Sequence, residues 1–405
     1  MTHLAPQPWM TAPQTVRLMT ALGEARFVGG VVRNALLGKP VADIDVATPH
    51  TPDKVRRLLQ AAGIKAVPTG IEHGTITAVV DGMPFEVTTL RRDVETDGRH
   101  AVVAFTTDWS EDAQRRDFTM NALYADASGA VFDYVGGIDD LEGGRVRFVG
   151  DPAARIREDY LRILRLFRFH AWYGQGPLDA AAVYAAEKEK HGLAKLSGER
   201  IAKEMLKLLE AENPVAVLIA MGEIGVLAAV IPGAADIMRL KRLAAADASA
   251  GLASDGILRL AALLPRAVLI AQVVAARWKL SNAQQGRLLD LVGAGEEITP
   301  YLSTHQVAKL LYKLGPERFG DRVRLAWTDA PQAFVQWRTF LAAGNDWQRP
   351  VFPLSGDDVL AAGIAKGPAV GAVLGEVEAW WIDNGFPPHR AALDQVFQAA
   401  VTKVR

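Results

Sequence analysis

The chain has 405 residues, half of them hydrophobic, which is enough for two or more domains with substantial cores. Its 45 basic and 46 acidic residues give a net charge of −1, which excludes a uniformly basic nucleic-acid-binding surface and leaves only local basic patches. The absence of cysteine excludes disulfides, thiolate metal sites and cysteine nucleophiles, and the eight histidines lack metal-binding spacing. No apolar run reaches about eighteen residues and no signal-peptide pattern opens the chain, so we expect a cytoplasmic protein without a membrane span.

The first part of the chain predicts a helix, a strand, a tight turn and a second helix. Residues 12–23 begin at an Ala-Pro pair suited to a helix start and end at a glycine. A short apolar strand follows at residues 26–28, then a Gly-Gly pair and an amphipathic helix over residues 31–37. Backbone amides at this turn can cradle a triphosphate, with Gly30 in the turn and Arg33 adding a charge-assisted contact. A plain strand-to-helix connection is the alternative.

Two carboxylates stand two positions apart in the next segment. Asp43 and Asp45 flank Ile44, and Val46 continues the alternation. In a strand, side chains at i and i+2 point to the same face, roughly 6–7 Å apart, and acidic residues are otherwise poor strand formers. Two such carboxylates can share divalent ions, as two-metal phosphoryl transfer requires. The spacing therefore predicts a metal site of the nucleotide-polymerising type at Asp43 and Asp45.

The pattern G-G-x-x-R followed by D-I-D resembles the nucleotidyltransferase motif shared by bacterial tRNA CCA-adding enzymes and bacterial poly(A) polymerases. The resemblance to this class II tRNA nucleotidyltransferase and poly(A) polymerase family implies an α+β fold, in which a mixed β-sheet head precedes an all-α neck, body and tail. It implies a catalytic head over residues 1–148, a neck with a base-reading helix over residues 149–212, and a tRNA-binding body and tail over residues 213–405. It also implies Mg²⁺ as the cofactor, held by Asp43 and Asp45.

Three strand-like segments follow at residues 64–68, 75–80 and 84–90, with Asp-Gly as the hairpin turn between the last two. Glu86 falls on the polar face of the last segment, so it is either a solvent-facing side chain or a third carboxylate that completes the metal site or acts as a base. The sequence E-V-T-T-x-R resembles the family and implies the catalytic role. The preceding T-G-I-E-H-G-T-I-T resembles the CCA-adding branch.

Residues 91–103 are polar, charged and without periodicity. We predict a mobile loop beside the site, with an exposed hairpin loop as the alternative. In CCA-adding relatives a flexible loop in this region is implicated in adding the final A. The resemblance therefore implies addition of the complete CCA.

Residues 115–122, R-R-D-F-T-M-N-A, resemble the second motif of the family. We predict a buried helix whose charged residues need partners, because unpaired charges at a core edge are costly. Arg116 can bind phosphate, Asp117 can cap the helix, and Asn121 can hydrogen-bond sugar or backbone. A strand, a Gly-Gly turn and a last short strand are expected to close the head.

After the head, strand patterns disappear and a helix is predicted over residues 153–172, apolar on nearly all sides yet carrying several charges. Asp159 and Arg162 are i, i+3 neighbours on such a helix. A carboxylate accepts from an exocyclic amino group and a guanidinium donates to the adjacent acceptor, so this pair can select C and A against U and G. An internal salt-bridge ladder is the alternative. The segment resembles the family's E-D-x-x-R base-reading motif, which implies this role for Asp159 and Arg162, with Arg165 and Arg168 as phosphate or structural partners.

The remainder of the chain is predicted to be all helical, with Ser281 and Ser303 as N-caps and two helices near the end. Residues 367–371 open one of the last helices, where exposed amides can grip an RNA phosphate. An ordinary helix-turn-helix with two tryptophans in its core is the alternative. Resemblance to CCA-adding tails, which hold the elbow of tRNA, favours the contact.

The resemblance implies a transferase that adds C, C and A to the 3′ end of tRNA from CTP and ATP, without a membrane partner. A poly(A) polymerase acting on generic RNA is one alternative, although the chain lacks a long basic tail for unstructured RNA. A non-catalytic RNA-binding protein is another, against which the intact carboxylates argue. The sequence leaves open full or partial CCA addition, the switch from C to A, and the oligomeric state.

Overall fold

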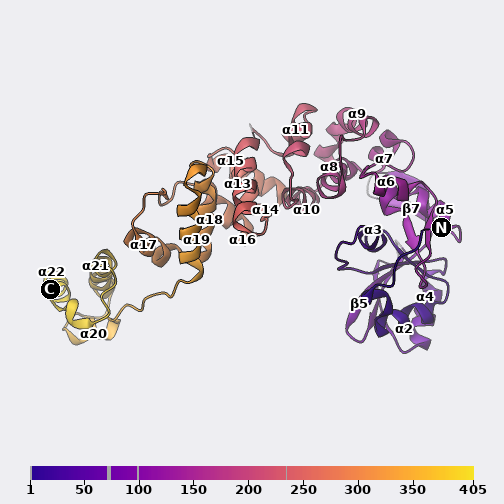
Figure 1. The fold of residues 1–405 in the computed structure, drawn as a ribbon. Helices are drawn as coiled ribbons and strands as arrows, with labels where there is room; N and C mark the ends of the chain where they lie inside the picture. Colours follow the sequence, from indigo (N-terminus) through magenta and orange to yellow (C-terminus); the bar gives the residue numbers. More distant parts are fainter. Residues whose placement is uncertain (1, 71–73, 98–99, 234) are drawn as a thin grey trace. The chain divides into compact units, whose positions relative to one another are not determined.

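The computed structural model describes residues 2–70, 74–97, 100–233 and 235–405. The chain forms two compact units: Met1–Ala235 with Gln272–Asn282, and Asp236–Ala271 with Ala283–Arg405. The first unit holds the β-sheet and the first set of helices, and the second is entirely helical over its described residues (Figure 1). No helix among these residues combines the length and the apolar character needed to cross a membrane.

The first unit contains a mixed β-sheet of seven strands. A mixed sheet was predicted for this part of the chain. Its spatial order is β3-β4-β5-β2-β1-β8-β9, in which only β2 and β5 are parallel neighbours. The strands are β1 Arg26–Val28, β2 Asp45–Thr48, β3 Lys65–Gly70, β4 Thr75–Val80, β5 Met83–Thr89, β8 Leu123–Ala125 and β9 Val131–Asp133. Alternate residues of β4 are buried, because Ile76, Ala78 and Val80 point into the core. The prediction for residues 75–80 is confirmed to the residue.

Short helices flank the sheet. They are α1 Pro8–Thr11, α2 Pro13–Leu22, α3 Gly30–Leu36, α4 Pro52–Ala61, α5 Trp109–Gln114, the 3₁₀ turn η2 Thr119–Asn121 and α6 Gly137–Glu142. Helices α2 and α4 pack on each other and on β4. Both begin with proline in the first turn, and α2 ends at Gly23, whose φ of 71° favours glycine. The N-terminal segment is ordered too, because the Trp9 ring packs edge-on against Phe27.

Three expectations for the head are wrong. Residues 91–103 form most of an antiparallel hairpin, β6 Arg91–Asp97 and β7 His100–Phe105, which is closer to the alternative of a hairpin than to the predicted loop; residues 98–99 lie outside the described residues. Backbone pairing with a Val-rich return strand forms this hairpin without an apolar pattern on the outgoing strand.

The second error concerns the R-R-D segment, where α5 ends before Arg115 and only the single turn η2 follows. The Asp117 carboxylate accepts from the Phe118 amide at 2.8 Å, a local bond that competes with helix formation. The third concerns the end of the head. The second Gly-Gly pair begins helix α6 instead of forming a turn, and in place of the last expected strand there is a single β-bridge between Phe118 and Phe148.

The helix predicted over residues 153–172 is two helices, α7 Pro152–Glu158 and α8 Leu161–Tyr173. Asp159 separates them in an extended conformation, with φ −156° and ψ 106°. The buried character of α8 is confirmed, because its residues Ile163, Leu164, Leu166 and Phe167 are fully enclosed. Asp159 and Arg162 therefore do not share one helical face.

The other helices of the first unit continue from α8. They are α9 Ala180–Glu189, the 3₁₀ helix η3 Lys190–Lys195, α10 Gly198–Leu209, α11 Val215–Glu223 and α12 Val226–Val230, and they are joined by the end of α15 Val268–Trp278. Helices α11 and α12 are separated at Gly225, whose φ is 77°. Helix α10 packs along α8, which places its side chains beside the start of that helix.

The second unit consists of helices around two apolar clusters. Its helices are α13 Ile237–Ala250, α14 Gly256–Leu263, α16 Asn282–Val292, α17 Thr304–Leu314, α18 Pro316–Trp327, the 3₁₀ turn η4 Pro331–Ala333, α19 Phe334–Asn345, α20 Gly356–Ala361, α21 Pro368–Asp383, the 3₁₀ turn η5 Arg390–Ala392 and α22 Asp394–Val404. Trp337 anchors one cluster and Trp381 the other. Ser303 caps α17 through a reciprocal bond with Gln306, as predicted. Three α-helices, α20, α21 and α22, form the C-terminal part of the chain, whereas two helices were predicted near the end.

Candidate active site

Three carboxylates meet at one edge of the sheet in the first unit. Asp45 is the first residue of β2, whereas Asp43 lies in the segment before it. The strand, which was predicted to include both residues, therefore begins two residues later than expected. In the parallel pair of β2 with β5, Asp45 is the register partner of Glu86. Phe85 and Val87 on either side of Glu86 are buried while Glu86 is exposed. Glu86 therefore lies on the same face of the sheet as Asp45.

Asp43, Asp45 and Glu86 line a single cavity of about 510 Å³. Thr77, the partner of Glu86 on β4, lines it as well, and so does Trp9 from α1. The cavity thus combines three carboxylates with an aromatic side chain, from segments far apart in the sequence.

The electrostatics of this cavity suit a bound cation. Burial raises the pKa of Asp45 to about 6, with Glu86 and Asp43 adding to the rise and Arg116 opposing it. No salt bridge among the described residues involves Asp43, Asp45 or Glu86. Within the part of the chain that the structure describes, no group of three or more acidic or histidine side chains is placed to hold a metal ion by itself. Mg²⁺ at nucleotide sites is held by one or two carboxylates with substrate phosphates and waters, so this donor set fits it.

The Gly-Gly turn differs from expectation in one respect. Gly29 takes a φ of 72°, which favours glycine, but its amide donates to the Leu123 carbonyl at 3.1 Å and is not free for phosphate. Arg33, which is only 6 % exposed, lies beside Gly30 with its guanidinium Nη2 3.6 Å from where a Cβ would stand. Its Nη1 donates to the Asn121 side-chain oxygen at 2.5 Å and its Nη2 to the Tyr173 hydroxyl at 2.9 Å. Burial lowers the pKa of Arg33, whose partners are neutral.

Arg116 is held in place on one side only. Its Nη2 donates to the Asp112 carboxylate at 2.9 Å and its Nε to the Tyr124 hydroxyl at 3.1 Å. Burial alone would raise the pKa of Asp112, but Arg116, Arg115 and a bond from Tyr124 lower it to about 2. The Nη1 atom of Arg116 lies 3.6 Å from the Cβ position of Gly29, so this edge of the guanidinium faces the glycine turn.

Asp159 and Arg162 are each bound to other residues. Asp159 accepts from the Arg200 guanidinium at 2.6 Å and from the Leu161 amide at 3.1 Å. Arg162 donates to the Arg155 carbonyl at 2.8 Å and pairs with the Glu158 carboxylate. The salt-bridge alternative is thus partly present, between Arg162 and Glu158 rather than Asp159.

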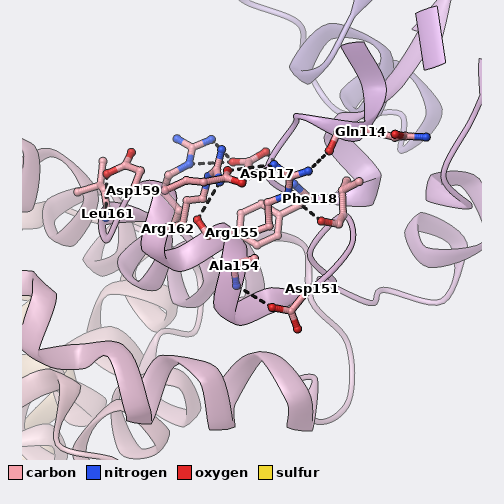
Figure 2. A network of polar contacts seen from close by, with 12 residues as sticks. Gln114, Asp117, Phe118, Asp151, Ala154, Arg155, Asp159, Leu161 and Arg162 are labelled. Carbon is pink, nitrogen blue, oxygen red and sulfur yellow. Dashed lines mark hydrogen bonds and ion pairs between the residues drawn. The ribbon is translucent and has the colours of Figure 1, made fainter. Parts of the chain in front are cut away.

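Figure 2 shows the network around α7, in which Asp151 caps the helix at Ala154 and Arg155 reaches the Gln114 carbonyl at the end of α5. Arg155 also donates to both oxygens of Glu158, at 2.9 Å each. These bonds join the start of the neck to the head.

Arg165 and Arg168 lie further along α8 in ion pairs. Arg165 donates from Nε to Asp117 at 2.8 Å, and Arg168 donates from Nε to Glu204 of α10 at 2.5 Å. Burial alone would raise the pKa of Asp117, but the Arg165 guanidinium and bonds from Arg165, Asn121 and the Phe118 amide lower it to about 2. The two arginines connect α8 to the head and to α10, which favours the structural partnership over phosphate binding.

Sequence reasoning missed the residues that hold the expected site residues in place. Asp112 and Tyr124 bind Arg116, Tyr173 binds Arg33, and Arg200 binds Asp159. The i, i+4 spacing of Asp112 and Arg116 was the one usable signal. The others come from separate elements and carry no pattern.

Comparison with known proteins agrees with this architecture. Residues 25–147 match the family described as the poly(A) polymerase head domain, and residues 178–238 match the probable RNA- and SrmB-binding site of polymerase A. The mitochondrial CCA tRNA nucleotidyltransferase 1 of Danio rerio is 34% identical over 373 residues, which cover 88% of this chain and 83% of that protein. The CCA-adding enzyme of Levilactobacillus brevis is 32% identical over 403 residues, covering 96% of this chain and 98% of that enzyme.

A solved structure extends the likeness to the whole fold. The crystal structure of the Bacillus stearothermophilus CCA-adding enzyme in complex with CTP aligns with a TM-score of 0.79 and 26% identity over 98% of this chain and 99% of that one. The sheet and its carboxylates therefore define a nucleotidyltransferase, a class of enzyme that uses divalent metal ions. The chain belongs to the family of CCA-adding enzymes, the CCA tRNA nucleotidyltransferases, which confirms the resemblance.

Proposed function

We propose that this chain adds C, C and A to the 3′ end of tRNA without a nucleic-acid template, with CTP and ATP as nucleotide donors. The observation that carries the proposal is the register of Asp45 with Glu86, which gathers three carboxylates at one cavity of the head. Relatives named for CCA addition that match nearly the full length of the chain support the choice of substrate. We also propose that it acts in the cytoplasm.

We assign Asp43 and Asp45 to holding two Mg²⁺ ions, because they line the same cavity and have no salt-bridge partner among the described residues. Bound there, Mg²⁺ would supply Lewis-acid stabilisation of the attacking tRNA 3′-hydroxyl and of the leaving pyrophosphate. Glu86 adds a third carboxylate across the β2–β5 register, as a further oxygen ligand or as the acceptor of the hydroxyl proton.

The triphosphate is assigned to Gly30, Arg33 and Arg116. Arg33 has no carboxylate partner among its recorded contacts, and Arg116 directs its Nη1 toward the glycine turn while Asp112 and Tyr124 hold its other donors. A guanidinium fixed on one side loses little freedom when it binds phosphate on the other.

Asp159 and Arg162 are assigned to reading the base, and their present partners orient them. A carboxylate offers about four acceptor positions, so the bonds from Arg200 and the Leu161 amide leave Asp159 able to accept from an exocyclic amino group. A guanidinium has five donors, and the bonds of Arg162 recorded here use only Nη1. Arg165 and Arg168 keep α8 in place beneath this pair.

The division of labour along the chain is also proposed: a catalytic head over residues 1–148, a neck over residues 149–212, and a body and tail over residues 213–405 that bind tRNA. The head match at residues 25–147 supports the first boundary. The compact units divide after Ala235, so the second boundary separates functions within a unit.

The proposal is tested with Asp43→Asn and Asp45→Asn, assayed for CTP incorporation into tRNA that lacks CCA. Losing a metal ligand removes several kcal/mol of transition-state stabilisation, so we expect a decrease of about a thousandfold or more in each variant. Asp53→Asn is the matched control, because Asp53 lies exposed on α4 and pairs only with Arg56. Asp43→Asn and Asp45→Asn variants that incorporate CTP as fast as Asp53→Asn would contradict the assignment.

A further inference from the structure

The second unit contains a cavity of about 340 Å³ that the proposed reaction does not use. Most of its lining residues come from α13, α16, α18, α19 and the segment between α16 and α17, all within this unit. Three arginines line it: Arg239, Arg266 and Arg322. Much of the rest of the lining is apolar, including Trp337.

Arg239 is buried without a partner for its charge. The residue is 6 % exposed, and its Nε atom is enclosed with no hydrogen bond. Its one recorded side-chain bond runs from Nη1 to the Ala261 carbonyl at 3.4 Å, and no ion pair of Arg239 is found among the described residues. Burial lowers the pKa of Arg239, and the positive charge of Arg266 adds to this effect, while the carboxylates of Asp329 and Asp236 oppose it without forming an ion pair. A buried cation without a paired anion is energetically costly. The cavity is therefore missing an anionic partner for the Arg239 guanidinium.

Arg322 is a second arginine of the lining that has an unsatisfied donor. Its Nη2 is engaged by Asp290, through the carbonyl at 2.8 Å and the carboxylate at 3.0 Å, but its enclosed Nε has no hydrogen bond. The guanidinium lies against Gly295, where a Cβ would stand 2.0 Å from Nη1. Glycine at position 295 thus leaves the room that this arginine occupies.

Three of the four charged residues in the exposed part of the lining are acidic. Glu296 pairs with Lys313, Asp329 pairs with the exposed Arg266, and Glu297 is the third. An RNA strand carries a negative charge at every phosphate and would meet these carboxylates, whereas one small anion reaches the interior past them. A volume of 340 Å³ holds such an anion with several waters, each of which takes about 30 Å³.

We propose that this cavity binds a small free oxyanion of the phosphate class, orthophosphate or pyrophosphate, through Arg239 and Arg322. The site is separate from the carboxylate cavity of the head, so it goes beyond the proposed function. Because the anion binds only the folded unit, its binding raises the stability of that unit by mass action.

The test uses the full chain in a buffer that contains a chelator of divalent cations. Orthophosphate and pyrophosphate are added in separate experiments, and chloride at equal ionic strength is the control. Thermal unfolding and equilibrium dialysis with labelled orthophosphate are measured on wild type and on Arg239→Met. We expect phosphate to raise the unfolding temperature of wild type, and Arg239→Met to abolish the rise and weaken phosphate binding roughly ten- to hundredfold. Without phosphate, Arg239→Met should unfold no earlier than wild type, because the variant removes an unpaired buried charge.

Arg338→Met is the matched control, since Arg338 is exposed on α19 and outside the lining; it should keep the full response to phosphate. Arg239 lies in the part of the chain proposed to bind tRNA, but only 6 % of it is exposed. Arg239→Met should therefore also retain CTP incorporation and tRNA affinity, which separates this site from the proposed function. No binding by wild type at about 10 mM phosphate, or equal binding by Arg239→Met, would overturn the proposal. Weakened tRNA binding in Arg239→Met without phosphate binding in wild type would also overturn it, and would identify an RNA contact.

Discussion

Three arginines of the first unit, Arg33, Arg165 and Arg168, differ in whether their contact partners are charged or neutral. Arg165 and Arg168 are paired with the buried carboxylates of Asp117 and Glu204, so their charges are satisfied inside the protein. Arg33 has only neutral partners in its recorded bonds, although it is just 6 % exposed. A buried guanidinium with neutral partners is suited to receive a phosphate, and so is one such as Arg116, which keeps an edge free beside its ion pair with Asp112. The ion pairs of Arg165 and Arg168 instead stabilise the fold.

Base selection is the residue-scale prediction. Asp159→Ala removes the acceptor for the exocyclic amino group of C and A, so we expect discrimination against UTP and GTP to fall roughly ten- to a hundredfold. The measurement is kcat/KM for the four nucleotides on tRNA lacking CCA. Asp139→Ala, at an exposed position of α6, is the control and should leave selectivity unchanged. Full selectivity in Asp159→Ala would contradict the base-reading assignment.

At the scale of elements, a hydrogen bond from α7 and an ion pair from α8 attach the helical neck to the head. Arg155 of α7 reaches the Gln114 carbonyl at the end of α5 (Figure 2), and Arg165 of α8 binds Asp117. The break at Asp159 lets α7 and α8 make these bonds separately. The position of α8 against the head therefore depends on the charge of Asp117.

This dependence predicts a pH effect. Asp117 has its pKa lowered from 3.8 to about 2, so its ionised form stabilises the fold above pH 4 and this contribution is lost as the pH falls toward 2. Asp117→Asn should lower the free energy of unfolding by about 2–3 kcal/mol at pH 7, with the difference shrinking between about pH 4 and pH 2. Urea unfolding across this range measures it, with the exposed Asp53→Asn as control. A difference that stays constant with pH would argue against the pair.

The elements with a strong periodic signal were predictable from the sequence, and those set by distant contacts were not. Strand β4 alternates buried and partly exposed residues, so its bounds were correct. The break at Asp159 was hidden, because apolar residues continue at helical spacing through it while bonds from Arg200 and the Leu161 amide hold Asp159 in its extended conformation. The hairpin over residues 91–105 depends on backbone pairing, which leaves no pattern in its charged first strand.

The candidate site was predictable in part for the same reason. Asp43 and Asp45 are close in sequence, so a local pattern predicted that they share a site. The alternation along β5 put Glu86 on a polar face but left a solvent-facing role open, and only the family resemblance favoured the site. The side chains that hold Arg116 and Asp159 come from other elements. Their contacts appear only once the chain is folded.

At the scale of the whole molecule, the carboxylate cavity lies in the first unit and the arginine cavity in the second. The likeness to CCA-adding enzymes extends over both, since the Bacillus stearothermophilus structure covers 98% of this chain. Arg239 and Arg322 belong to different helices of the second unit and to no motif, so the sequence did not indicate their meeting. With a net charge of −1, the proposed binding of RNA must come from local surfaces rather than from overall charge.

The central claim is that the chain builds CCA on tRNA. The most direct measurement is incorporation of labelled CTP and ATP, separately and together with Mg²⁺, into tRNA lacking CCA, tRNA ending in CC, and an unstructured RNA. We predict two C residues followed by one A on the first substrate, a single A on the second, and none on the third. Long A tracts on the unstructured RNA, or no incorporation into any substrate, would contradict the account.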